Sequence, residues 1–169
     1  MKLKDMNSLL AHEVKDLLHA EKQLTRALPK MASAVNDQRL RKAIENHLRE
    51  TEEHVQRLER VCSELGIAAR GERCAAMEGL IAEGSELLEQ DDADPAVRDA
   101  AIIAAAQRVE HYEIAGYGAA RAFAQQLGLE SVVELLQQTL DEEGAADKKL
   151  TEVAESSVNP RAMEAAAKR

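Results

Sequence analysis

Acidic residues stand at core positions in three long helical repeats of this chain. In residues 7–36, apolar side chains recur every three or four residues, which is the spacing of a helix packed in a bundle. Glu21 occupies a place in that repeat where a leucine is expected, and Glu113, Glu143 and Asp147 interrupt two later repeats in the same way. A buried carboxylate without a partner is costly or gives up its charge. The chain must therefore fold so that these acids share a cation.

The apolar repeats predict five helices, four of them long. We expect them at about 7–36, 38–65, 77–90, 95–127 and 129–156, with Gly66 and Gly128 as helix stops. Short turns make the first two helices antiparallel, and likewise the last two. The long link between these pairs carries the short helix and favours a ferritin-like connection over a simple up-down-up-down bundle.

The composition agrees with this architecture and narrows the class of protein. The 169 residues include only 8 glycines and 3 prolines, which suits an all-α fold. We therefore predict that residues 1–169 form a single ferritin-like domain, a four-helix bundle with a long crossover carrying an extra short helix. The polar, alanine-rich residues after position 156 are expected to form a loosely attached tail.

Charge and hydropathy exclude two kinds of partner. The net charge of −9 argues against nucleic acid, because an acidic surface repels phosphate backbones. No apolar run is long enough to span a membrane, and the N-terminal stretch lacks an apolar signal segment. A cytoplasmic protein without a membrane partner is expected.

The interrupting acids are expected to meet at one level of the bundle. Glu21 and Glu113 each lie about fifteen residues before a turn, and residues 50–54 and 143–147 lie about fourteen to eighteen after one. With a rise of about 1.5 Å per residue, these groups fall within roughly one helical turn of the same level. All four long helices thus send acids or histidines to one layer.

Carboxylates and a few histidines on facing helices form the ligand set of a carboxylate-bridged dinuclear site. Oxygen-rich sites with some imidazole suit iron or manganese, so two ions of either metal are the expected cofactors. The candidate ligands are Glu21, Glu50, His54, Glu110, Glu113, Glu143 and Asp147, with His47 as an additional candidate.

Several of these positions have a second interpretation. His47 and His54 are either ligands or hydrogen-bonded core histidines, and Glu50 is either a ligand or a solvated neighbour of the stripe. Glu110 is either a second ligand on its helix or a group that orients a ligand. No catalytic residue is identified with certainty. Tyr117, one turn from the acid at position 113, is the best candidate, although packing is the more common role for such a residue.

Five stretches of the chain resemble the bacterial YciE/YciF stress-protein family, and its YciF branch most. They are AEKQLTRALPKMA (20–32), HLRETEEHVQRLE (47–59), CAAMEGLIAEG (74–84), VRDAAIIAAAQRVEHYEIAGYG (97–118) and LDEEGAADKKLTEVA (140–154). The resemblance implies a ferritin-like bundle, a homodimer, a role in bacterial stress responses and a ferroxidase label.

By position, the family's motif residues fall on Glu21, His47, Glu50, Thr51, Glu110, Glu113, Glu142, Glu143 and Asp147. The family position often filled by glutamine is His54 here, so a nitrogen ligand at that point is not a family requirement. Ferritin-like enzymes carry ExxH on their second helix, whereas this chain reads HLRETEEH. This departure leaves the ligand set on that helix, and any ferroxidase or catalase reaction, open. Glu142 is expected to face solvent.

Two functions follow from these observations. The first is a dinuclear iron or manganese protein that reacts with dioxygen or peroxide during stress. The second is a non-enzymatic helical homodimer that acts as a stress-related binding or structural protein and keeps a vestigial metal site. A storage or DNA-protecting cage fits less well, because the surface is acidic and there is no lysine-rich arm.

Overall fold

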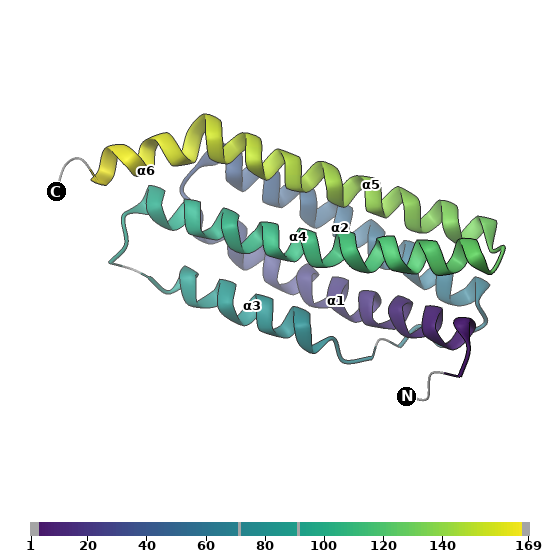
Figure 1. The fold of residues 1–169 in the computed structure, drawn as a ribbon. Coiled ribbons are helices and arrows are strands. Elements are labelled where there is room, and N and C mark those ends of the chain that lie inside the picture. The colour runs from purple at the N-terminus through teal and green to yellow at the C-terminus, as the bar shows by residue number, and fades with distance from the viewer. Residues whose placement is uncertain (1–3, 71, 91, 167–169) are drawn as a thin grey trace.

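The structure is a computed structural model that describes residues 4–70, 72–90 and 92–166 (Figure 1). Its helices are α1 (Met6–Ala34), α2 (Gln38–Glu64), α3 (Ala75–Leu88), α4 (Pro95–Gln126), α5 (Glu130–Val153) and α6 (Asn159–Ala166), and a π-helical turn (Ala154–Val158) joins α5 to α6. None of the helices in these ranges has the length and apolar character needed to cross a membrane.

The four long helices form two antiparallel hairpins, α1–α2 and α4–α5 (Figure 1). The link that carries α3 returns along the bundle, so α2 and α4 run in the same direction (Figure 1). Helix α1 packs against α2 and α4, α5 packs against the same two helices, and α3 lies on α1 and α4. This is the ferritin-like connection, and the predicted all-α bundle with its crossover helix is confirmed.

Several helix ends are set by glycine, proline and capping residues that can be recognised in the sequence. Gly66 and Gly128 adopt φ of 65° and 70°, the left-handed conformation that glycine reaches most easily, and each follows the end of a long helix. Asp94 accepts a hydrogen bond from the Ala96 amide and precedes Pro95 at the first position of α4. These residues fix the end of α2, the start of α4 and the turn between α4 and α5.

The apolar core is divided into two clusters. One contains Leu24, Ile44 and Ile102 from the half of the bundle nearest α6, and the other contains Leu10 and Leu136 from the opposite half. The candidate ligands lie between them in the sequence of every long helix. The bundle is therefore two apolar cores separated by a polar layer.

The C-terminal segment is packed, which corrects the expectation of a loose tail after residue 156. Ser157 and Val158 are buried, and the Ser157 hydroxyl donates a 2.7 Å hydrogen bond to Asp37. Arg161 on α6 also pairs with Asp37, the residue that caps α2 through the amides of Arg39 and Leu40. The buried Asp37 carboxylate needs these partners, and they hold the segment against the bundle. Residues 167–169 lie outside the described part of the chain.

Replacing Asp37 by alanine should lower the free energy of unfolding by about 1–2 kcal/mol, because the cap of α2 is lost together with the anchor of the C-terminal segment. Asp37→Asn keeps a capping oxygen and should cost less. Urea unfolding followed by circular dichroism measures both losses. An alanine variant as stable as the native chain would show that these contacts add nothing to the fold.

Candidate metal centre

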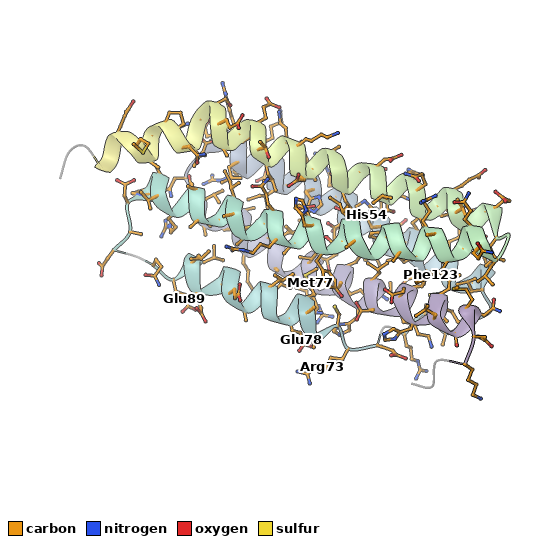
Figure 2. All side chains as sticks on the ribbon, in the orientation of Figure 1. His54, Arg73, Met77, Glu78, Glu89 and Phe123 are labelled. Carbon is orange, nitrogen blue, oxygen red and sulfur yellow. The ribbon has the colours of Figure 1, made fainter. Side chains whose placement is uncertain are left out.

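Six buried side chains meet halfway along the bundle, where Figure 2 shows His54. They come from all four long helices and are Glu21 on α1, His47 and His54 on α2, Glu110 and Glu113 on α4, and Glu143 on α5. Steps of seven residues on α2 and three on α4 return to the same helix face, so each pair points into the bundle. The layer expected from the sequence is present.

The six residues form two groups that share Glu143. In the His54 group (Glu21, His54 and Glu143), His54 Nδ1 lies 3.3 Å from Glu21 Oε1 and 3.0 Å from Glu143 Oε1. In the His47 group (His47, Glu110, Glu113 and Glu143), His47 Nε2 lies 3.3 Å from Glu110 Oε1 and 3.9 Å from Glu143 Oε2. Within each group, one potential ligand atom per residue lies within 4.8 Å of all the others. Glu143 turns one oxygen to each group, as a bridging carboxylate does.

Most of the oxygens in these groups have no hydrogen-bond partner among the described residues. Both oxygens of Glu113 are buried and unpartnered, as are Glu21 Oε2 and Glu110 Oε2. Leaving such an atom unsatisfied costs about 1–3 kcal/mol, and more when it is charged. Two divalent cations would both satisfy these oxygens and balance the four carboxylates. The residues present therefore fit a dinuclear site.

Without a metal, positive charge on the two histidines neutralises part of the negative charge of the carboxylates. Burial alone would lower the pKa of His54, but the carboxylates of Glu143 and Glu21 beside its Nδ1 raise that pKa to about 10. Burial likewise opposes protonation of His47, and Glu110 with the other nearby acids raises its pKa to about 9. Both rings are therefore cationic at neutral pH in the metal-free protein. A metal ion must displace their inward protons in order to bind.

Burial acts in the opposite sense on the acids. It raises the pKa of Glu113 well above its usual value, and the neighbouring carboxylates, Glu21 first among them, raise it further. Burial also raises the pKa of Glu110, although His47 opposes this effect. The pKa of Glu143 is lowered instead, because its contacts with the two histidines outweigh burial. The shared carboxylate is thus the one held most firmly as an anion.

The outward nitrogen of His54 is fixed by a second set of contacts. Its Nε2 lies 2.9 Å from Glu142 Oε2, and Arg57 donates a 2.8 Å hydrogen bond to the same oxygen. Glu142 is 28% exposed, so the expectation that it faces solvent was wrong. A carboxylate on the far nitrogen commonly orients a metal-binding histidine. Arg57, which sequence reasoning missed, lies one turn after His54 on α2 and steers the orienting carboxylate.

Tyr117 completes the wall of the His54 group. Its side chain is fully buried, and its hydroxyl donates a hydrogen bond to Glu21. This contact holds one oxygen of Glu21 and leaves the other unpartnered. The structure thus gives Tyr117 an orienting contact with a candidate ligand.

Glu50 and Asp147 stay outside both groups, which differs from the expectation that they are ligands. Glu50 is 47% exposed, and its carboxylate lies 3.6 Å from the outer nitrogen of His47. Asp147 is 21% exposed and accepts a 2.9 Å hydrogen bond from Gln107. Because a helix turns about 100° per residue, a step of three or four residues leaves a side chain roughly 40–60° away from its starting direction. Which of two such positions faces the centre depends on how the helix is rotated against its neighbours: on α4 both Glu110 and Glu113 do, whereas Glu50 and Asp147 stand at the edge of the polar layer.

Comparison with known proteins places the chain among relatives of nearly equal length. The family model of a domain of unknown function, DUF892, matches residues 5–163. Protein YciF of Escherichia coli strain K12 is 45% identical over 163 residues, which cover 96% of this chain and 98% of that protein.

Solved structures show the same similarity. The crystal structure of the E. coli stress protein YciF superposes with a TM-score of 0.88 at 46% identity, covering 93% of this chain and 99% of that one. YcfI from Rhodopseudomonas palustris gives a TM-score of 0.85 at 43% identity, covering 89% and 95%. A Xanthomonas campestris protein that is only 20% identical gives 0.79, covering 96% and 99%, and shows the fold alone.

Replacing Glu113 by methionine should stabilise the metal-free protein by about 1–3 kcal/mol, because two unsatisfied buried oxygens are removed. The gain should grow with pH. The pKa of Glu113 is near 4.5 in the unfolded chain and higher in the folded one. The native protein is therefore favoured below pH 4.5, where Glu113 is protonated, and it loses stability as pH rises towards the folded pKa. The methionine variant has no such loss. Urea unfolding of metal-free protein at pH 5 and 8 measures this.

Glu52→Met is the matched control, because Glu52 is an exposed acid on α2. It should change stability little at either pH. A Glu113→Met protein that is less stable than the native chain at both pH values would contradict the conclusion that the Glu113 carboxylate is unsatisfied without a metal.

Proposed function

The chain belongs to the DUF892 family, and from this premise we propose that it is a stress-response metalloprotein with two iron or manganese ions that reacts with dioxygen or peroxide. The observation that carries the proposal is the pair of buried ligand groups that share Glu143, with their unpartnered oxygens. The similarity to the E. coli stress protein YciF supports the physiological setting.

The donor set favours redox-active metals of intermediate hardness. Seven ligand positions, counting the shared carboxylate once in each group, comprise five carboxylate and two imidazole positions and no thiolate. Carboxylate with imidazole suits iron and manganese, whereas a thiolate-rich set would favour structural zinc. Two such ions, when bound, supply the electrons that reduce dioxygen or peroxide.

The chain's own residues hold, orient and enclose that chemistry. Tyr117 fixes Glu21, and Glu142 fixes the ring of His54 so that Nδ1 points inward. The apolar clusters on either side keep bulk water from the His54 group. His47 and His54 would give up their inward protons to let a metal bind, and His54 would keep its Nε2 proton, which Glu142 is placed to accept in a hydrogen bond.

Elemental analysis of protein purified without an affinity tag tests the proposal. Near two iron or manganese ions per chain are expected after loading with Fe(II) or Mn(II), because the groups offer two sets of donors. Glu21→Ala/Glu113→Ala should lose both ions, since each substitution removes a ligand from one group. Glu52→Gln should keep them. A native chain that takes up neither metal would contradict the proposal.

Reaction with an oxidant is tested separately from metal content. Native protein loaded anaerobically with Fe(II) should oxidise the metal at least about tenfold faster than the double variant when peroxide or dioxygen is added, because only the native chain holds the ions in preorganised positions. Stopped-flow absorbance follows the oxidation. Equal rates for the two proteins would leave a metal-binding protein without this reaction.

A second candidate function is favoured by the charge balance of the metal-free layer. The pKa values of His47 and His54 are raised to about 9 and 10, so the two rings neutralise part of the layer without metal. The fold can therefore persist as a stress-related structural or binding protein, and a structural role is also suggested, without being established, in the description of YcfI of R. palustris. In both cases we propose a cytoplasmic homodimer, which analytical ultracentrifugation would test.

A further inference from the structure

A large cavity opens beside the His47 group. It has a volume of about 760 Å³ and lies between α2 and α5, with α1 and α4 behind it. Its apolar wall includes Leu28, Met31, Ile44, Ala106, Leu150 and Val153. His47 and Glu110 also line it, so the cavity reaches the candidate metal layer. The volume lies within the range of about 300–1,000 Å³ that is usual for small-molecule sites.

The cavity is elongated along the bundle. Its lining on α2 extends from Arg39, in the first turn, to Glu50, beside the metal layer. At a rise of about 1.5 Å per residue, this is roughly 16 Å. The lining on α5 runs alongside it, from Ala145 to Val153, and ends at Ser156 in the π-helical turn. The shape suits a linear molecule lying along the groove rather than a compact one.

Two cations stand at the end of the cavity away from the metal layer. Arg39 and Lys42 line it there, and neither forms an ion pair with any residue in the described ranges. Lys149 also lines the cavity but is paired with Glu152 at 2.8 Å. Glu152, which also lines the cavity, faces Arg39 as well as Lys149, so one acid stands against three cations there. In a chain with a net charge of −9, this local excess of positive charge attracts an anion.

We propose that this cavity binds a medium-chain aliphatic carboxylate, with the carboxylate at Arg39 and Lys42 and the hydrocarbon chain running along the apolar wall to the His47 group. Burial of the hydrocarbon supplies most of the affinity, because apolar surface gains free energy when it leaves water. The cations fix the orientation. The binding site stands without metal, whereas a role for the bound molecule as substrate or regulator of the metal centre rests on the proposed function.

Binding of decanoate and of decanol to the metal-free protein, measured by isothermal titration calorimetry, tests the inference. The native chain should bind both, and decanoate more tightly. Arg39→Gln/Lys42→Gln should weaken decanoate at least about tenfold and leave decanol unchanged, because only the carboxylate meets the cations. Ala146→Phe, which projects a ring into the cavity from α5, should weaken both ligands.

The control is Arg108→Gln/Lys148→Gln. These exposed cations do not line the cavity, and the substitutions change the net charge by the same amount. The control should bind decanoate like the native chain. The inference is overturned if the two double variants bind decanoate equally, or if Ala146→Phe retains full affinity while circular dichroism shows it folded.

Metal content measured on the same proteins separates this inference from the proposed function. The cavity variants should keep the ions of the native chain, because none of them alters a ligand. A chain that holds two ions but binds no decanoate would overturn the inference alone. A chain that binds decanoate as expected but takes up no metal would overturn the proposed function alone.

Discussion

The burial of four carboxylates in one layer is the constraint on which the rest of this structure depends. Glu21, Glu110, Glu113 and Glu143 are each at most 3% exposed, and within the described part of the chain only His47 and His54 face them as cations. Such a layer opposes folding, because burial disfavours charge and leaves oxygens unsatisfied. The bundle tolerates it because burial of the apolar clusters above and below stabilises the fold and offsets the cost of burying the carboxylates. The layer is kept at some expense in stability, which is typical of functional sites.

The sequence predicts the polar layer well because two periodicities coincide. Helical spacing shows which positions face the core, and the distance of each acid from its turn shows its level in the bundle. Both kinds of information are local once the turns are placed near residues 36–37 and 128–129, and the structure has the α1–α2 and α4–α5 turns there, with Gly128 at φ of 70°. Glu21, Glu113 and Glu143 interrupt apolar stripes, and they are the acids that the structure buries completely.

The sequence is less informative where a side chain stands at the edge of a stripe. Glu50 and Glu142 stand beside the apolar stripes, and Asp147, which interrupts a stripe in the sequence, lies outside both ligand groups in the structure. The rotation of each helix about its axis decides whether such a side chain faces the centre. That rotation depends on how the neighbouring helix packs, which no local pattern records. Glu142 is turned towards His54 by Arg57, a partner from another helix. The packing of the C-terminal segment escaped prediction for the same reason, because Asp37 lies 124 residues from Arg161.

The two groups of candidate ligands are unequal in their surroundings. The three residues of the His54 group are completely buried, and Tyr117 and Glu142 each hold one of them in place. The His47 group borders the large cavity, which also contacts His47 and Glu110 directly. A small molecule that enters from solvent through that cavity therefore reaches the His47 group first. The side chains of the enclosed His54 group are held in a fixed arrangement, whereas those of the His47 group can be contacted by an incoming molecule. Glu143 belongs to both groups and connects them.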